Sequence, residues 1–333
     1  MARLFHSEIC DLLGLDVPIL QGAMQGGGGV KLVVAVCEAG GLGVLPTFGA
    51  GDRKLREDIA AVRAKTDRPF GVNIMPMGKG ITERCVATCV ELGVPIVTTG
   101  RADPGKDAVR TLKDARIKVV SVIPTVAHAR RMEDEGVDAV VASGMEAGGH
   151  VGHVATMPLV PQVVDAVKLP VIAAGGIGDG RGFVAALALG AVGIQIGTRF
   201  MATKESDLND WGRARLQDMC ETDTLVTRSL TGATVRSIAT PEIIAYEKAV
   251  AEHASDAEVA AAARVVRASR SRTNKSESCQ SAAGQIAGMI KDEPTVAELM
   301  TRILREASAI VDGLAGCAKG NARAPRLSRV GGG

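Results

Sequence analysis

The chain has 333 residues, of which 46% are hydrophobic, 23% charged and only 2% aromatic, and its formal net charge is +2. This apolar content is too high for a disordered chain, and the apolar runs are too short to cross a membrane. A near-neutral charge with few aromatic rings disfavours nucleic acid as a partner. No long apolar run follows a basic start, and seven cysteines are an odd number. We therefore expect a cytoplasmic protein with reduced thiols.

Taken in chain order, short apolar runs alternate with helix-like stretches. The runs predicted to be strands are Pro18–Ala23, Leu42–Pro46, Phe70–Met75, Pro95–Gly100, Ile117–Pro124, Ala139–Gly144, Pro170–Gly176 and Gly193–Thr198. The stretches predicted to be helices are Lys31–Ala39, Arg53–Lys65, Thr82–Leu92, Lys106–Ala115, Val126–Glu135, Leu159–Val167 and Arg181–Leu189. Strands that are apolar along their whole length are typical of parallel sheets buried on both faces. Eight strand–helix units predict the α/β fold class and a (β/α)8 TIM barrel, with an open doubly wound sheet as the alternative.

The alternation stops after Phe200, where the chain becomes polar and rich in Arg, Ser and Thr. One Ala-rich helical stretch is predicted near Ala249–Ala268, followed by a solvated linker at Ser269–Ser278. An amphipathic helix near Val296–Leu314 has the spacing to dock on the barrel. The sequence therefore predicts a barrel core, an inserted helical lid or substrate subdomain, a C-terminal helix that returns to the barrel, and a disordered tail, over residues 1–200, 201–280, 281–316 and 317–333.

Glycine-rich turns follow the seventh and eighth predicted strands. Residues 173–177 read AAGGI, and residues 197–199 read GTR. Phosphate sites in (β/α)8 barrels are built from the loops after these two strands, where glycines let backbone N–H groups approach an anion. Thr198 can add a hydroxyl. Two such turns in neighbouring units favour a phosphate site, although glycines that only form tight turns remain the alternative.

The turn after the first predicted strand has a different character. Gly22, Ala23 and Met24 are small and apolar enough for a flat ring to lie against the backbone, and Asn73 brings an amide to the end of the third strand. These features suit a planar, phosphorylated cofactor. FMN fits better than a dinucleotide because no GxGxxG motif follows the first strand, and no Walker motif is present.

His150 is the predicted catalytic residue. It follows a glycine pair after the sixth strand, so it can reach the barrel mouth and polarise a carbonyl, donate a proton or hold an anion. A structural hydrogen-bonding role is the alternative for this histidine. His153 is expected on the outer side of the same loop. Cys85 and Cys89 share a helix face without further ligands nearby, so no metal site is expected.

Several motifs together resemble the nitronate monooxygenase and enoyl-acyl-carrier-protein reductase II superfamily of FMN-binding barrels. They are QGAM (21–24), EAGGLG (38–43), RPFGVNIM (68–75), VTTG (97–100), MEAGGHVG (145–152), PVIAAGGIGDGRG (170–182), GTRFMATKES (197–206) and AGQIAGMI (283–290). The likeness covers about Leu4–Phe200 and resumes around Ala283–Leu304. The compact chain is most similar to the enoyl reductase II branch, while TRSLTGATVR (227–236) is shared with a branch that reduces quinones.

The resemblance implies a site around FMN, with His150 as the catalytic residue beside the flavin. The turn at Gly22 would lie against the isoalloxazine ring, and Thr198 would be among the residues that hold the phosphate. The residues implied to bind the cofactor are Gly22, Ala23, Met24, Asn73, Ser143, Gly148, Gly149, Ala174, Gly175, Gly176, Gln195, Gly197 and Thr198.

The resemblance also implies an FMN-dependent oxidoreductase that uses NADH or NADPH to reduce an activated C=C bond, such as that of a trans-2-enoyl thioester. Oxidation of alkyl nitronates with O2, reduction of quinones and flavin binding without catalysis are the alternatives. Expected partners are a small molecule or an acyl thioester, including an acyl carrier protein, and a second copy in a homodimer. One departure is the glycine run Gly26–Gly29, which predicts that a wall of the pocket is missing.

Overall fold

The computed structural model describes residues 5–47, 51–75, 80–100, 104–272 and 282–318, with no account of the side chains of 269–272. Eight parallel strands form one sheet, in the order β1-β9-β8-β6-β5-β4-β3-β2. The strands are β1 (Ile19–Gln21), β2 (Val44–Pro46), β3 (Gly71–Ile74), β4 (Ile96–Thr99), β5 (Lys118–Ile123), β6 (Ala139–Ser143), β8 (Val171–Ala174) and β9 (Gly193–Ile196). All eight predicted strands are confirmed.

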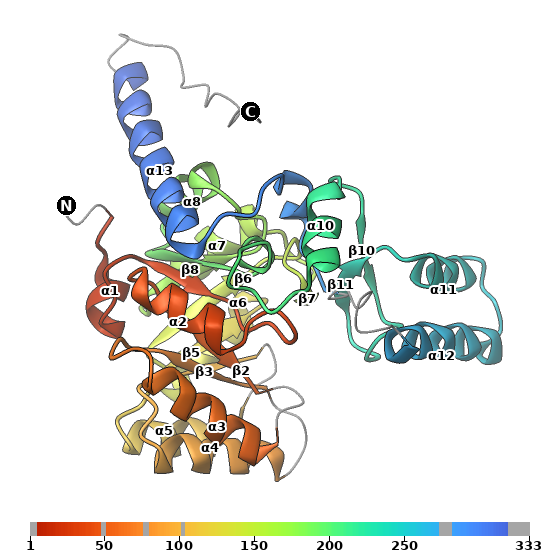
Figure 1. Cartoon of the computed structure of the whole chain (residues 1–333), viewed down its shortest axis with the longest axis horizontal. Coiled ribbons are helices and arrows are strands. Elements are labelled where there is room, and N and C mark those ends of the chain that lie inside the picture. The colour runs from red at the N-terminus through yellow and green to blue at the C-terminus, as the bar shows by residue number, and fades with distance from the viewer. Residues whose placement is uncertain (1–4, 48–50, 76–79, 101–103, 273–281, 319–333) are drawn as a thin grey trace.

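The two edges of this sheet meet and close it into a barrel. The Gln21 N–H donates to the Leu42 carbonyl oxygen at 2.8 Å, and the Leu42 N–H donates to the Ile19 carbonyl oxygen at 3.1 Å. This closure excludes the open doubly wound sheet and confirms the predicted (β/α)8 barrel. Figure 1 shows the strands at the centre of the fold, with helices packed around them.

The helices of the barrel are α1 (Glu8–Leu13), α2 (Val30–Glu38), α3 (Asp52–Arg63), α4 (Ile81–Glu91), α5 (Lys106–Asp114), α6 (Val126–Glu135), α7 (Thr156–Val164) and α8 (Gly180–Ala188). Seven of them, α2 to α8, lie close to their predicted positions, whereas α1 was not predicted. The strand side chains are apolar on both faces because both faces are buried, one inside the barrel and the other against the outer helices. On β8, Ile172 and Ala174 pack in one cluster with α1, whereas Val171 and Ala173 pack in the larger cluster that contains the outer helices.

A second, smaller sheet lies beside the barrel mouth. It has the order β10-β11-β7 and is antiparallel, with β10 (Thr224–Thr227), β11 (Val235–Ile238) and β7 (Gly149–His150). The sequence did not predict this hairpin. Its third strand, β7, consists of two residues from the loop after β6, so the segment that follows the barrel pairs directly with the loop that carries the predicted catalytic histidine.

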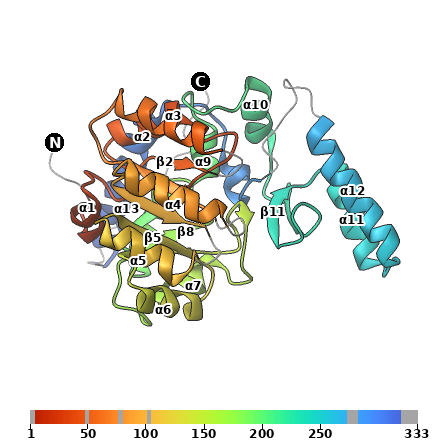
Figure 2. The same ribbon diagram turned by 90° about the horizontal axis from the view of Figure 1, so that it is seen from below.

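The predicted helical stretch near Ala249–Ala268 is confirmed for residues 256–268, but it is interrupted at residues 252–255. Two helices, α11 (Pro241–Ala251) and α12 (Asp256–Arg272), pack against each other and project away from the barrel in Figures 1 and 2. The chain turns between them at His253, which has a φ of 56°. Ser255 then starts α12, because its hydroxyl accepts from the Glu258 N–H at 3.4 Å while its own N–H donates to the Glu258 carboxylate at 2.9 Å.

The remaining helices bring the C-terminal part of the chain back to the barrel. They are α9 (Thr198–Met201), α10 (Asp210–Asp218), the 3-10 helix η1 (Gln285–Met289) and α13 (Val296–Ala318). α13 packs on α8 and α2, which confirms the predicted docking helix. The predicted linker and tail both begin too early, because residues 269–272 belong to α12 and residues 317–318 to α13. The rest of the linker up to residue 278 and of the tail lies outside the described residues, and the division into residues 1–200, 201–280, 281–316 and 317–333 stays a prediction.

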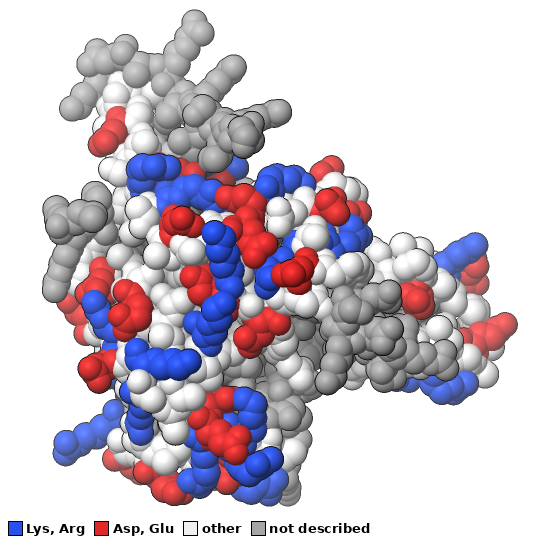
Figure 3. Space-filling view, in the orientation of Figure 1, with Lys and Arg blue, Asp and Glu red and all other residues white. Residues whose placement is uncertain are grey.

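The charged side chains of both signs are interspersed over the face shown in Figure 3. Among the described helices, none is both long and apolar enough to span a membrane.

Candidate active site

A cavity of about 290 Å³ opens at the carboxyl ends of the barrel strands. This is the end at which (β/α)8 barrels carry their active sites, because the loops that follow the strands converge there. All the residues predicted to bind the cofactor line this cavity, as does His150; they are Gly22, Ala23, Met24, Asn73, Ser143, Gly148, Gly149, Ala174, Gly175, Gly176, Gln195, Gly197 and Thr198. The structure therefore brings together residues from the ends of five barrel strands that lie far apart in the sequence.

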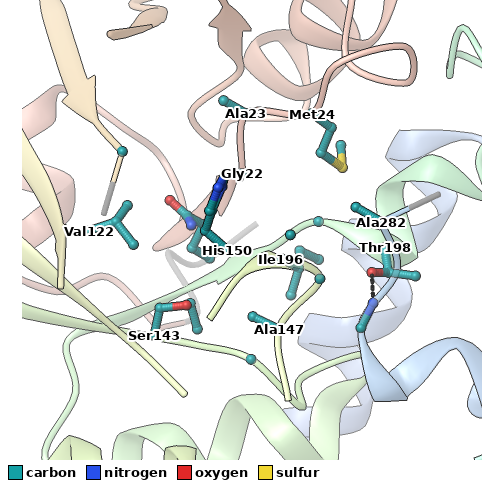
Figure 4. A pocket seen from close by; sticks show the side chains of 18 of the residues that line it. Gly22, Ala23, Met24, Val122, Ser143, Ala147, His150, Ile196, Thr198 and Ala282 are labelled. Atoms are coloured by element: carbon teal, nitrogen blue, oxygen red, sulfur yellow. Dashed lines mark hydrogen bonds between the residues drawn. The ribbon is translucent and has the colours of Figure 1, made fainter. Parts of the chain in front are cut away.

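The turn after β1 forms one side of the cavity. The Gly22 N–H donates to the Ile196 carbonyl oxygen at 2.9 Å, which fixes the turn against β9. A Cβ atom on Gly22 would lie 3.5 Å from the Gln195 side-chain nitrogen, so the backbone and the carboxamide are in close contact. Figure 4 shows Gly22 to Met24 on one side of the cavity and Ser143 and Ala147 across from them.

Asn73 presents a fixed carboxamide at the cavity wall. Its side chain donates from Nδ2 to the Thr98 hydroxyl at 2.9 Å, while its main-chain carbonyl oxygen accepts from the Thr47 hydroxyl at 2.7 Å. The residue is only 9% exposed. A buried amide needs such partners, so the orientation of this group is set by the neighbouring strand.

The glycine turn after β8 requires glycine for two reasons. Gly175 and Gly176 have φ values of 93° and 71°, which side-chain-bearing residues rarely adopt. A Cβ on Gly175 would also lie 2.9 Å from the Thr156 hydroxyl. That hydroxyl is within hydrogen-bond distance of the Glu146 carboxylate (2.9 Å) and of the Gly175 carbonyl oxygen (3.0 Å), so the turn is packed against the start of α7.

The turn after β9 is bound by the returning C-terminal segment. Thr198 accepts a hydrogen bond at its hydroxyl from the Gly284 N–H at 2.9 Å, drawn as the dashed line in Figure 4. The next N–H, that of Gln285, donates to the Glu146 carbonyl oxygen at 2.9 Å. Ala282, Gly284 and η1 thus complete the cavity wall next to both glycine turns.

His150 lies on β7, half-buried, and its side chain lines the cavity. Its backbone pairs with Val235 of β11, and the Val151 N–H donates to the Thr234 carbonyl oxygen at 3.0 Å. The imidazole Nε2 is 3.4 Å from the Thr231 hydroxyl at the tip of the β10–β11 hairpin. The histidine is thus held by the hairpin that covers the barrel mouth.

A buried arginine ties this hairpin to the loop before His150. Arg236 donates from Nε to the Met145 carbonyl oxygen at 2.8 Å and from Nη1 to the Thr224 hydroxyl at 3.1 Å. Burial lowers the pKa of Arg236, and the nearby Glu146 carboxylate opposes this shift. The guanidinium stays charged, because an arginine pKa begins far above neutral pH.

Sequence reasoning missed several residues that line the cavity. Those from the hairpin are Leu230, Thr231 and Val235, and the other residues include Met75, Val122, Glu146, Ala282, Gly284 and Ile286. The AGQIAGMI motif was a signal for the C-terminal contributors, since it is similar to a family motif far from the barrel strands. The hairpin residues belong to the motif TRSLTGATVR (227–236), but the sequence did not predict where this motif lies relative to the barrel.

The prediction that Gly26–Gly29 removes a pocket wall stays a prediction. None of these four glycines lines the cavity. They pack against the segment after α9: the Gly27 carbonyl oxygen accepts from the Ser206 hydroxyl at 3.2 Å, and a Cβ on Gly29 would overlap the Asp207 carboxylate at 1.9 Å.

The other candidates lie away from the cavity. His153 is exposed, as predicted. Cys89 is buried in the helix layer, and burial raises the pKa of its thiol to about 12, so it is a packing residue. Within the described ranges, no group of three or more His, Cys, Asp or Glu side chains is placed to hold a metal ion.

Comparison with known proteins identifies the family. The family model described as nitronate monooxygenase matches residues 6–306, which is most of the chain. The chain belongs to the nitronate monooxygenase family. Members of this family are FMN-dependent oxidoreductases, and the present chain is therefore an oxidoreductase of this kind.

Individual relatives divide between different reactions. A probable nitronate monooxygenase of Staphylococcus aureus is 35% identical over 279 residues, which cover 70% of this chain and 78% of the relative. The structure of FabK from Thermotoga maritima superposes with a TM-score of 0.86 at 38% identity, over 94% of this chain and 99% of FabK. A nitroalkane oxidase from Streptomyces ansochromogenes superposes with a TM-score of 0.79 at 28% identity, over 92% and 99% of the two chains.

A third kind of relative is named as a dehydrogenase of a CoA thioester. The (3aS,4S,5R,7aS)-5-hydroxy-7a-methyl-1-oxo-octahydro-1H-indene-4-carboxyl-CoA dehydrogenase of Rhodococcus jostii is 36% identical over 242 residues, covering 73% of this chain and 68% of the relative. Membership of the nitronate monooxygenase family is thus compatible with more than one substrate class.

Proposed function

We propose that this member of the nitronate monooxygenase family binds FMN in the barrel mouth and uses NADH or NADPH to reduce the activated C=C bond of a trans-2-enoyl thioester. The observation that carries the proposal is the likeness to FabK, an enoyl-acyl-carrier-protein reductase II, at 38% identity over 94% of this chain. The Rhodococcus relative, named as acting on a CoA thioester, supports the same substrate class.

The residues of the cavity fit FMN. The positive φ values of Gly175 and Gly176 and the Thr198 hydroxyl suit a phosphate, because they allow close approach of backbone N–H groups and a hydroxyl donor. The backbone at Gly22 offers a flat apolar surface for the ring, and the fixed amide of Asn73 offers hydrogen bonds to its polar edge. We assign the remaining predicted lining residues, Ala23, Met24, Ser143, Gly148, Gly149, Ala174, Gln195 and Gly197, to the ring and ribityl chain.

When bound, FMN supplies hydride transfer. The chain's own contribution is to hold the acceptor in place and to stabilise the negative charge that develops on it. We assign His150 the role of polarising the thioester carbonyl, or of protonating the product, from Nε2. The Thr231 hydroxyl, 3.4 Å from that nitrogen, limits the rotation of the imidazole. Apolar residues from the strand ends and the hairpin, including Met75, Val122 and Leu230, suit an acyl chain and exclude water.

The segment 201–280 is proposed to act as the lid of this site. Its β10–β11 hairpin contributes Leu230 and Val235 to the cavity wall and pairs with β7. Opening of the hairpin would therefore expose the cavity and release His150 at the same time. An acyl carrier protein or a free thioester would reach the flavin through this entrance.

Oxidation of an alkyl nitronate with O2 is the second candidate. It is favoured by the match to the nitronate monooxygenase model and by the Staphylococcus relatives. In that reaction His150 would lie beside the nitro group, and no nicotinamide would be needed.

Anaerobic mixing of the flavin-loaded protein separates the two reactions. With the reductase, NADH or NADPH bleaches the flavin absorbance rapidly, and a trans-2-enoyl thioester restores it. With the monooxygenase, only a nitronate bleaches the flavin. A His150→Ala variant that retains FMN and full turnover with every acceptor would remove the role assigned to the histidine.

A further inference from the structure

Four charged side chains form a network between the C-terminal helix and the two glycine turns. Arg199 donates from Nη2 to Asp292 Oδ1 at 2.5 Å and from Nη1 to the Asp292 carbonyl oxygen at 3.4 Å. Arg302 of α13 donates from Nη1 to Asp292 Oδ2 at 2.6 Å. Glu306, one turn further along α13, contributes to the electrostatic environment of Arg199.

The network reaches the turn after β9 through Arg199, which directly follows Thr198 in the sequence. Its side chain is only 6% exposed. The segment that carries Asp292 also carries Gly284, whose N–H donates to the Thr198 hydroxyl. Residues 284–292 therefore hold the turn twice, by a neutral hydrogen bond at Thr198 and by an ion pair at Arg199.

The same network reaches the helix that follows the turn after β8. Glu306 accepts a hydrogen bond at Oε2 from the Gly180 N–H at the start of α8, at 3.0 Å. A Cβ on Gly180 would lie 2.5 Å from the Glu306 Cβ and 2.7 Å from the Ala307 nitrogen, so the backbone of α13 is in direct contact with α8. Gly176 is four residues before Gly180 in the sequence, and both turns are thus supported by one helix.

Asp292 is the residue that balances the charge in this arrangement. Burial lowers the pKa of Arg199, whereas the Asp292 carboxylate opposes that shift and keeps the guanidinium paired. A buried cation that loses its carboxylate partner is poorly solvated and moves toward water or another anion. Such a movement would displace the backbone next to Thr198, because Arg199 is its neighbour in α9.

We propose that Asp292 is a positioning residue for the phosphate of FMN, acting through Arg199 on the turn at Gly197 and Thr198. This inference rests on the proposed function, since it requires the FMN phosphate at that turn. It assigns to the C-terminal segment a role in selecting a phosphorylated flavin over its dephosphorylated form, beyond covering the barrel.

The test compares FMN with riboflavin, which has the same ring and ribityl chain but no phosphate. Flavin-free protein is titrated with each ligand, and the quenching of flavin fluorescence gives the two dissociation constants. The variants are Asp292→Asn and Arg302→Gln, the second of which leaves the contact between Arg199 and Asp292 in place. Glu205→Gln is the matched control, because Glu205 anchors the start of α13 through the Val296 N–H at 3.0 Å without touching Arg199.

We expect Asp292→Asn to weaken FMN binding by about tenfold or more, which corresponds to the loss of one charge-assisted hydrogen bond between the displaced turn and the phosphate. Riboflavin binding should be unchanged. Arg302→Gln removes one of the two arginines that hold Asp292 but keeps the Arg199 contact, so it should raise the ratio of the FMN to the riboflavin dissociation constant by less. This variant decides the matter if Asp292→Asn does not fold. Equal weakening of both flavins, an unchanged ratio, or the same change in Glu205→Gln would overturn the inference. A wild-type protein that binds FMN no better than riboflavin would instead refute the phosphate site itself.

Discussion

Replacing Gly175 with alanine should damage both the fold and the cofactor site. The residue has a φ of 93°, and the new Cβ would lie 2.9 Å from the Thr156 hydroxyl, 3.1 Å from the Gly144 carbonyl oxygen and 3.2 Å from the Ala147 nitrogen. The backbone strain costs about 1–2 kcal/mol, and the crowding costs about 1–3 kcal/mol. We therefore expect the free energy of unfolding to fall by about 2–5 kcal/mol in all.

Two further glycines separate strain from crowding. Gly176 has a φ of 71°, but the nearest atom to an added Cβ is 3.6 Å away; Gly136, at the end of α6, has a φ of 88° and nothing within 4 Å. Gly176→Ala and Gly136→Ala should each cost only about 1–2 kcal/mol of stability, measured by urea unfolding without flavin. Gly136→Ala is the matched control, because it lies outside the cavity lining.

FMN binding should distinguish these variants. Gly175→Ala shifts the turn proposed to bind the phosphate, so its dissociation constant for FMN should rise by about 10–100-fold, the loss of one charge-assisted hydrogen bond. Gly136→Ala should bind FMN like the wild type. If Gly175→Ala binds FMN as tightly as Gly136→Ala does, the phosphate does not lie at this turn and the reasoning is refuted.

Three other predictions concern His150, Thr231 and Asp292. His150→Ala should keep its FMN while kcat falls by about 10²–10⁴-fold, the range for a lost acid–base group; steady-state turnover beside the flavin absorbance checks both. Thr231→Val removes the hydrogen bond to His150 and should lower kcat by about fivefold, the effect of one ordinary hydrogen bond, with FMN affinity unchanged. A change in FMN affinity instead would place Thr231 in the cofactor site. The pKa of Asp292 lies below its ordinary value of 3.8, since Arg302 and Arg199 outweigh the effect of burial. Its contribution to stability is then present above that pH and is lost as the pH falls through the folded-state pKa. The urea concentration at the midpoint of unfolding should therefore fall more steeply below about pH 4 in the wild type than in Asp292→Asn. The same pH dependence in both proteins would contradict this.

The barrel could be predicted because its sequence signals are local. Each strand is short, apolar on both faces and bounded by Gly or Pro, so runs such as Val171–Ala174 stand out without knowledge of their partners. The glycine turns after β8 and β9 could be assigned to one site, because the carboxyl ends of parallel strands meet at the same end of a barrel.

The small sheet could not be predicted, because it depends on pairing between distant segments. β7 consists of Gly149 and His150 alone, and it exists only because β11 lies beside it. The two strands of the hairpin are four residues each and are joined by a seven-residue loop, Arg228–Thr234, which gives no short-turn signal. For this reason the contact between His150 and Thr231 was missed.

The break between α11 and α12 did have a local signal. Residues 255–258 read Ser-Asp-Ala-Glu, the pattern of a capping box at a helix start. The continuous alanine-rich composition around it suggested one helix instead. The network around Asp292 had no local signal, since Arg199 and Arg302 lie 103 residues apart and meet only when α13 docks.

Crystals grown with FMN provide the most direct test of the central claim. The account predicts flavin density in the barrel mouth, with the phosphate between the turns at Gly176 and Thr198 and the ring between Gly22 and His150. An empty cavity in crystals soaked at saturating FMN, or a flavin whose phosphate lies away from both glycine turns, would contradict it.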